Sequence, residues 1–557
     1  MNNKLKVFIS VSLIFSLIYF FLILKNKVPF GHDTFQYLQL QYIYFNEIVQ
    51  NHSIPVWFPF MSCGNVGNYY FTPQLTILSP IFYLLGLFIK DINYLYLFYF
   101  ALFFEELFFL LGIVLLSSLY YKETKTIFFV SITLLGTTIW YPQIWWNFHL
   151  FYFIPIVLYC IHRYFLTKLF RYFIFSIIFF TLTIYGNFIY CIIFSSFVIL
   201  TYILFLIPVY FNEIGLFFHK KVKLKYMAFL LILLSIIAMS FYYIKYGDEE
   251  IVYSGGERSK SDKVNVTTFL TYGGSIGLDK YKEIFTRYGY SDDINLYAGY
   301  LLIPFLLISL FYRKEKLSFV AGGISLILFL FSIGTFVSLF FYYVFPFGNM
   351  FRHIGLTTTV FKLFIVFYAG FGFEIFLKRM DTDKKIHYFM MVFLLATILL
   401  PYLINKGYLR NIPGKDLIYS STLIVILLII SIFLFYLMAR TKIKKEILLN
   451  LLLIIIAIDL FSYKYSLVVM RMSSVSKDAV NLFKPYRYNF QEKRLNDLNN
   501  SDNNRIKTFN SVVFRGAVYN TLESFLYTDL AASPYRADFL LKSSKRCSYI
   551  REKFPDG

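Results

Sequence analysis

The sequence predicts an all-α polytopic membrane protein with about 13 transmembrane helices and a small extracytoplasmic C-terminal segment of mixed α/β or β structure. Two observations carry this prediction. Of the 557 residues, 58% are hydrophobic and only 15% are charged, against roughly 25% charged in a soluble domain. Apolar runs long enough to form spans recur along the chain, and Lys and Arg concentrate in alternate loops between them.

The first apolar run, Val7–Leu24, predicts a retained transmembrane helix. At about 1.5 Å per residue it covers roughly 27 Å of membrane. Lys4 and Lys6 precede it, which predicts a cytoplasmic N-terminus. No small-residue cleavage site follows the run, so it does not read as a removed signal peptide.

Further candidate spans follow at intervals along the chain. They centre near Phe104, Leu134, Val157, Phe179, Val198, Leu233, Ile308, Phe329, Phe367, Leu394, Leu427 and Ile455.

The loops between the spans predict the topology. The basic clusters on one side are Lys122 and Lys125; Lys168 and Arg171; Lys220–Lys225; Arg313–Lys316; Lys378–Lys385; and Arg440–Lys445. On the other side lie the long loops 25–93 and 245–295 and the tail. We therefore expect a multi-pass protein of the plasma (inner) membrane, with a transmembrane domain over residues 1–465 and an extracytoplasmic tail over residues 466–557.

Charge and cysteine content exclude two other classes of protein. The net charge of +21 comes from basic residues in short loops, which is typical of membrane topology and predicts lipid rather than nucleic-acid partners. The four cysteines lack metal-ligand spacing, so the sequence predicts no zinc site.

The first long loop begins with a predicted interfacial helix. Apolar residues recur at a spacing of three and four, while polar residues fall on the other face, with Gln41 as an exception. The apolar set is Phe35, Leu38, Tyr42, Phe45 and Val49. We expect this face to lie toward the acyl chains. A second apolar segment, Leu75–Ile89, is interrupted by proline and is expected to re-enter the interface.

Asp33 opens this helix and has two interpretations. Asp33, Thr34 and Gln36 resemble a capping arrangement, in which the Asp33 carboxylate accepts from backbone N–H groups. A carboxylate that a helix N-terminus keeps ionised and oriented also suits a base for a hydroxyl proton. The sequence leaves both roles open.

Several short motifs resemble those of a known family. The first loop resembles the first outer loop of YfhO-type bacterial membrane proteins, of the GT-C glycosyltransferase superfamily, at Gly31, Asp33, Ile54-Pro55-Val56-Trp57, Cys63-Gly64 and Gln74–Pro80. Later motifs are similar in the same order: Tyr297-Ala298-Gly299, Phe351-Arg352, Ala369-Gly370 and Ile458-Asp459-Leu460. The chain departs from the family pattern at His353–Leu356, where a second proline and arginine are missing.

The resemblance implies a GT-C-like fold and an inverting membrane glycosyltransferase. Its donor would be a polyprenyl-phosphate sugar, and its acceptor a cell-envelope polymer or lipid on the extracytoplasmic face. The residue that matches the family's catalytic Asp is Asp33. No cofactor follows from these motifs, and a divalent metal stays open.

Five further residues are candidate substrate contacts. Arg352, on the outer side, could pair with the donor phosphate or with lipid headgroups. His32 adjoins Asp33, Trp57 suits the headgroup level, and His149 follows Trp145 and Trp146 at the outer end of a span. Glu105, like its neighbour Glu106, lies in mid-span, where a carboxylate needs a polar cavity or a partner such as Tyr or Lys.

The tail changes character after Tyr465. Asn496–Asn504 is rich in Asn and Asp, and Arg505–Leu541 alternates apolar and polar residues, which predicts a small mixed unit. No stop signal marks the final residues, so the tail is also compatible with truncation.

Two other functions fit the same sequence. A transporter or flippase of lipid-linked saccharides would more often show internal repeats and paired broken helices, which the sequence does not display clearly. A noncatalytic envelope assembly protein would look the same.

Overall fold

The computed structural model describes residues 3–28, 78–89, 91–137, 149–184, 189–210, 265–271, 275–284, 296–312, 315–346, 348–350, 354–404, 415–440, 444–470 and 473–474, with scattered residues between 38 and 66 and residues 480 and 484. The chain divides into two compact units. The first unit comprises Met1–Phe30, Phe98–Val209 and Val266–Lys477, and the second comprises Gly31–Leu97, Tyr210–Asn265 and Asp478–Gly557.

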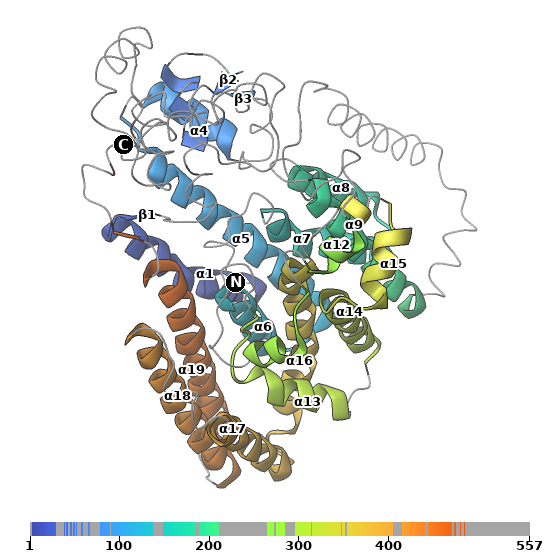
Figure 1. Ribbon diagram of the computed structural model, residues 1–557. Coiled ribbons are helices and arrows are strands. Elements are labelled where there is room, and N and C mark those ends of the chain that lie inside the picture. Colours follow the sequence, from blue (N-terminus) through green and yellow to red (C-terminus); the bar gives the residue numbers. More distant parts are fainter. Residues whose placement is uncertain are drawn as a thin grey trace, which may run out of the picture. The chain divides into compact units, whose positions relative to one another are not determined.

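The first unit is a helical bundle (Figure 1). Its α-helices are α1 (Asn3–Leu24), α5 (Tyr94–Tyr120, from Phe98 on), α6 (Thr124–Thr137), α7 (His149–Thr167), α8 (Phe170–Ile184), α9 (Ile189–Val209), α12 (Val266–Thr271), α13 (Leu302–Tyr312), α14 (Lys316–Ser332), α15 (Phe336–Val344), α16 (Thr358–Arg379), α17 (Lys384–Ile404), α18 (Lys415–Arg440) and α19 (Lys445–Tyr465). Short turns are η1 (Leu278–Ile284), η2 (Gly348–Met350), η3 (Ile354–Thr357) and the π-helical η4 (Ser466–Met470).

Helix α16 forms the centre of this bundle. It packs against α6, α13 and α14, and 83% of its most apolar stretch is buried. Small residues permit the close approach. A side chain at Gly372 would meet the backbone carbonyl of Phe305 in α13, and one at Gly370 would meet the Tyr121 hydroxyl. These two glycines therefore set how near the neighbouring segments lie.

The predicted helical segments agree with the structure. Every predicted span centre lies within a helix except Leu233, which falls outside the described residues. Among those residues, four helices are long and apolar enough to cross a membrane, namely α1, α5, α16 and α19. A bent pair, α14 and α15, makes a fifth if it counts as one span. The total of about 13 crossings stays a prediction.

The bend between α14 and α15 measures 83° and has a local cause. Gly334 has a φ of +75°, a left-handed conformation that glycine adopts without steric cost. Thr335 then caps α15, its side chain accepting from the Val337 N–H at 3.4 Å. The pair therefore forms a sharp corner in an apolar stretch.

Contacts between loops support the predicted alternation of sides. At one end of the helices, Lys125 pairs with Glu446, and Lys445 lies 3.6 Å from Asp381, so three predicted cytoplasmic loops meet. At the other end, β1 (Lys27–Val28) pairs antiparallel with β4 (Ser473–Ser474). The segments after α1 and α19 therefore lie together, as expected of two outer segments. Which end faces the cytoplasm stays a prediction.

The second unit contains the described part of the first long loop. It includes α4 (Ser79–Phe88) and a two-residue ladder of β2 (Trp57–Phe58) with β3 (Asn65–Val66). The described residues of the predicted interfacial helix are helical, but its apolar face is turned toward protein. Phe45 contacts Tyr94, and Phe45 and Val49 lie against Gly86. The expectation of an acyl-chain contact for this face is therefore wrong.

The exception in that helix, Gln41, has a structural explanation. Its side chain is 3% exposed, on the same buried side as Tyr42, and its Oε1 accepts a hydrogen bond from the Tyr94 hydroxyl at 3.2 Å. A buried polar group needs such a partner. The break in the apolar pattern therefore marks a tertiary hydrogen bond.

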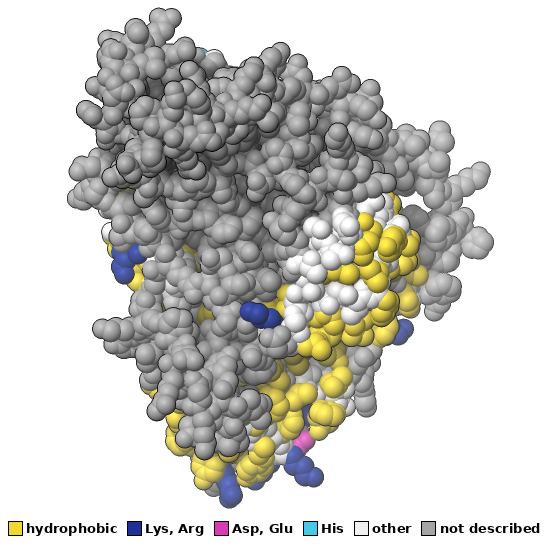
Figure 2. All heavy atoms as spheres, viewed as in Figure 1, with side chains coloured by type: hydrophobic (Ala, Val, Ile, Leu, Met, Phe, Trp, Pro, Cys, Tyr) yellow, Lys and Arg dark blue, Asp and Glu magenta, His cyan; other side chains and the backbone are white. Residues whose placement is uncertain are grey.

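Large apolar side chains cover the described surface of the first unit. On α1, Leu13 and Leu17 are exposed, and on α19 Ile454 and Ile458 are exposed, whereas Glu106, Lys362, Asp459 and Lys464 are buried. Figure 2 shows broad hydrophobic areas on one face, with Lys and Arg side chains at its lower edge. This distribution is compatible with helices embedded in a membrane.

The chain remains helical at the predicted end of the transmembrane domain. Helix α19 is followed directly by η4, and Lys464 is buried within α19. The predicted mixed unit, Arg505–Leu541, lies outside the described residues.

Candidate functional site: a buried charge cluster

Five charged or hydroxyl-bearing side chains meet inside the first unit. They are Glu106 of α5, Tyr297, Lys362 of α16, and Asp459 and Lys464 of α19. Their exposed fractions run from 1% to 4%. We call these five residues the buried charge cluster. Buried charges are costly unless they are paired and hydrogen-bonded, so each member needs partners from other elements.

Glu106 and Lys464 form the ion pair of the cluster. Lys464 Nζ lies 2.8 Å from Glu106 Oε2, and both side chains are almost completely buried. Tyr19 of α1 adds a side-chain hydrogen bond to Glu106. The Phe15 ring centroid lies 5.2 Å from Lys464 Nζ. The expected partner for this mid-span acid, a Tyr or Lys, is therefore confirmed.

Both lysines of the cluster also bind the end of α6. Lys464 Nζ donates to the Leu135 carbonyl at 2.9 Å, and Lys362 Nζ donates to the Thr137 carbonyl at 2.7 Å. The last four carbonyls of a helix have no intrahelical partner, and they form the negative end of its dipole. Two ammonium groups therefore bind backbone carbonyls in the last described turn of α6.

A glycine brings α6 close enough for these bonds. A Cβ built on Gly136 would lie 2.6 Å from Leu460 Cβ and 2.9 Å from the Phe15 ring. Real Cβ atoms do not approach other atoms so closely, so a larger residue would push α6 away. Gly136 therefore allows α6 to lie close enough for Lys464 to bond the Leu135 carbonyl.

Tyr297 and Asp459 join two distant segments. The Tyr297 hydroxyl lies 2.9 Å and 2.7 Å from the two Asp459 carboxylate oxygens and donates to them. The Tyr297 carbonyl accepts from Lys362 Nζ at 3.2 Å, which links this pair to the rest of the cluster. Gly299, with φ +92°, turns the chain beside Asp459 and Leu460. Asp459 is therefore held in a buried contact between these two segments.

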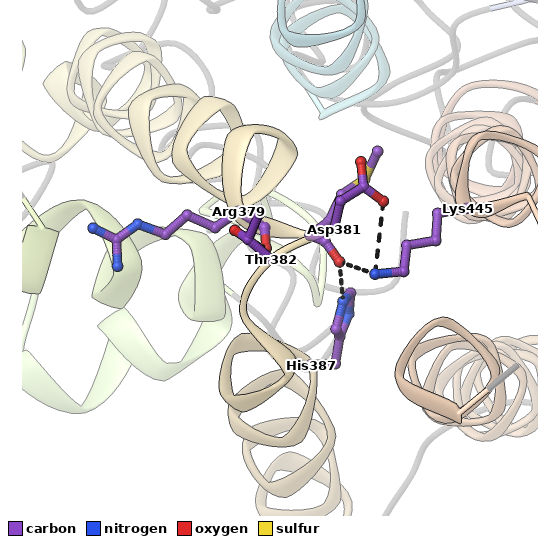
Figure 3. A network of polar contacts seen from close by, with 6 residues as sticks. Arg379, Asp381, Thr382, His387 and Lys445 are labelled. Carbon is purple, nitrogen blue, oxygen red and sulfur yellow. Dashed lines mark hydrogen bonds and ion pairs between the residues drawn. The ribbon is translucent and has the colours of Figure 1, made fainter. Parts of the chain in front are cut away.

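A second polar network lies at the turn between α16 and α17 (Figure 3). Lys445 donates to the Met380 carbonyl and lies 3.6 Å from Asp381 Oδ1. His387 Nε2 donates to the same Met380 carbonyl at 2.8 Å. Arg379 points away from this group and lies over the Tyr312 ring, 4.2 Å from its centroid. The network connects α19 to the turn, and Asp381 remains 69% exposed.

Only some of the candidate site residues from the sequence lie among the residues that the structure describes. Asp33, His32 and Arg352 lie outside the described residues. Trp57 is in β2 and His149 begins α7, with only their backbone described. Glu105 is 2% exposed within α5, beside Glu106. The described residues therefore bring no two of these candidates together.

Sequence reasoning missed Lys362 as a member of the cluster. It lies in the span centred near Phe367, and a lysine there carries the same signal as the mid-span acid Glu105. Lys464, which comes near the end of its apolar run, was not singled out either. A charged residue within a membrane span needs a partner or a polar cavity, whether it is an acid or a base. Applied to bases, this rule would have identified Lys362.

Comparison with known proteins adds no relative: no family model, no curated protein and no solved structure matches the chain.

In the part of the chain that the structure describes, no three His, Cys, Asp or Glu side chains form a group that could hold a metal ion. The cluster contains two lysines, two carboxylates and a hydroxyl. These groups can satisfy one another, fix helix ends, and hold or pass protons.

Proposed function

We propose that the chain is a membrane glycosyltransferase of the GT-C type. It transfers a sugar from a polyprenyl-phosphate donor to a cell-envelope polymer or lipid on the extracytoplasmic face of the plasma membrane. The helical bundle with an apolar surface supports a membrane enzyme in general. The motifs of the first outer loop support this particular reaction class.

One observation of the structure carries the proposal further. Two of the motifs that resemble the family, Tyr297-Ala298-Gly299 and Ile458-Asp459-Leu460, meet through the hydrogen bonds between Tyr297 and Asp459. Their separation along the chain is 162 residues. Two motifs that contact each other in the folded chain are expected to belong to one structural unit. This contact therefore favours a true family resemblance over a chance match of short motifs.

The reaction needs a base and a positive charge. In this proposal Asp33 takes the proton from the acceptor hydroxyl, which then attacks the anomeric carbon as the bond to the lipid phosphate breaks. Arg352 stabilises the departing phosphate by charge-assisted hydrogen bonds. His32, Trp57, Glu105 and His149 are the further candidate substrate contacts.

Substitution of Asp33 tests this function. Asn and Asp are about equally good helix caps, so Asp33→Asn should insert and express normally. It cannot accept a proton, so we expect sugar transfer to fall by about 10²- to 10⁴-fold. Asp91→Asn is the matched control, because Asp91 is an exposed acid of the same loop. Transfer to the envelope acceptor would be measured by mass spectrometry of lipid and polymer extracts at equal protein levels.

The outcomes are distinct. Full activity in Asp33→Asn would reject the catalytic role and leave Asp33 as a cap. Loss of activity in both Asp33→Asn and Asp91→Asn would show that the loop tolerates no loss of negative charge. The assignment of Asp33 as the catalytic base would then be rejected.

A second function, transport or flipping of lipid-linked saccharides, is favoured by one observation. Glu106, Lys362, Asp459 and Lys464 are buried among apolar helices, as in the charge relays of transporters. Proteoliposomes with a fluorescent polyprenyl-phosphate sugar separate the two functions. Translocation without any acceptor would support the transporter, and sugar transfer without translocation would support the enzyme.

A further inference from the structure

A groove opens on the surface of the first unit, between α1, α6 and α19. It encloses about 680 Å³. Its walls are largely apolar and include Leu17, Ile454 and Ile458, which are exposed at 50%, 54% and 45%. Exposed apolar side chains along a groove indicate a surface that an apolar partner covers.

The charged residues of the groove are confined to one end. Lys6, in the first turns of α1, and Lys125, near the start of α6, both line it. Helix α6 begins at Thr124, which also lines the groove, so the positive end of its dipole lies at the same end. The far end, at Leu17, Phe461 and Ser462, has no charged side chain among its lining residues.

One acid opposes these positive groups. Glu446, at the start of α19, pairs with Lys125 at 3.0 Å, and its side chain is 72% exposed. An ion pair so accessible to solvent contributes little, so a phosphate can take its place beside Lys125. Lys6 and Lys125 therefore both remain in reach of an anion.

We infer that this groove binds one anionic phospholipid from the leaflet at the Lys6 end. The phosphate pairs with Lys6 and Lys125, and an acyl chain lies along the apolar walls toward Leu17. From Lys6 to Leu17 the helix rises about 16 Å at about 1.5 Å per residue, which is half of the roughly 30 Å hydrocarbon core. Basic pockets between helices are typical sites for anionic headgroups.

This charge pattern favours a lipid over a second copy of the chain. A lipid has its charge at one end and is apolar along the rest, as the groove requires. The inference is independent of the proposed glycosyltransferase reaction, because none of the groove residues is a candidate for that chemistry.

Native mass spectrometry of the purified full-length protein in mild detergent tests the inference. Phosphatidylglycerol and phosphatidylcholine with identical acyl chains are added separately, so that only the headgroup charge differs. Lys6→Gln combined with Lys125→Gln should reduce phosphatidylglycerol binding by about tenfold and should remove the preference over phosphatidylcholine. Lys4→Gln combined with Lys122→Gln is the control, because it removes the same charge from the same segments outside the groove.

A second variant tests the acyl-chain part of the groove. Ala457 lines the groove midway along α19, and Ala457→Trp should fill it and weaken binding of both lipids without changing the lysines. Equal loss in the lysine variant and its control would overturn the site, because charge alone would then explain the preference. Unchanged binding in Ala457→Trp would also overturn it. A dimer that Ala457→Trp dissociates would identify a second copy as the occupant and reject the lipid.

Discussion

The ion pairs Glu106–Lys464 and Lys125–Glu446 join the same two kinds of side chain at similar distances, 2.8 Å and 3.0 Å. Their surroundings differ. In the first pair the side chains are 1% and 5% exposed, and in the second they are 31% and 72% exposed. The buried pair also bonds the Leu135 carbonyl of α6 and the Tyr19 hydroxyl, whereas the exposed pair connects the first turns of α6 and α19.

The difference teaches that distance alone does not rank these contacts. Removing one partner of a buried pair leaves an uncompensated charge in a medium that cannot solvate it. Removing one partner of an exposed pair leaves a charge that water solvates and salt screens. The buried charge cluster should therefore decide the stability of the bundle, while exposed pairs such as Lys125–Glu446 adjust it slightly.

The largest effect is expected for Lys464→Met. The change removes the ammonium that pairs with the Glu106 carboxylate and donates to the Leu135 carbonyl, so the free energy of unfolding should fall by about 3–5 kcal/mol. Thermal unfolding of the detergent-solubilised protein would measure it. The double variant Lys464→Met with Glu106→Leu removes both charges and should recover most of the loss. A double variant that is no more stable than the single one would contradict the pairing.

An intermediate effect is expected for Tyr297→Phe. Its hydroxyl donates to the Asp459 carboxylate, and hydrogen bonds to charged groups contribute about 1.5–3 kcal/mol. Tyr300→Phe is the matched control, because this equally buried hydroxyl contacts Ser431 Oγ at 2.9 Å, a neutral partner. The same unfolding measurement should give a larger loss for Tyr297→Phe. Equal losses would show that the charge of Asp459 adds nothing.

The smallest effect is expected for Lys125→Met. The exposed pair with Glu446 should contribute less than about 1 kcal/mol. Raising the salt concentration should abolish the difference between this variant and the unchanged protein, because screening weakens exposed charges. Unfolding midpoints at low and high salt would measure both. A loss as large as that of Lys464→Met would remove the distinction between the two pairs.

Much of the architecture could be predicted from the sequence. Hydropathy marks apolar runs that become helices, because a chain in an apolar medium must satisfy its backbone hydrogen bonds internally. The clustering of basic residues predicts which loops share a side, and Lys125 with Glu446 and Lys445 with Asp381 do lie together. The cost of a charge in mid-span predicts that Glu106 has a partner.

The interfacial helix predicted from the sequence was assigned the wrong partner, lipid instead of protein. Its amphipathic pattern identifies the apolar side, and a lipid surface or a protein surface can equally cover that side. Tyr94 and Gly86 cover the described residues, and the hydrogen bond from Tyr94 to Gln41 explains the exception in the pattern. Periodicity therefore fixes the buried face and leaves its partner open.

By itself, the sequence determined the helical class, the apolar character of the helices, and the presence of charges that require partners. Only the tertiary structure decided that Lys464 is the partner of Glu106, 358 positions away, and that both cluster lysines bind the end of α6. Hydropathy and periodicity are properties of neighbouring residues. The contacts of the cluster depend on which helices pack together and how closely, which Gly136 sets by allowing α6 to approach α19.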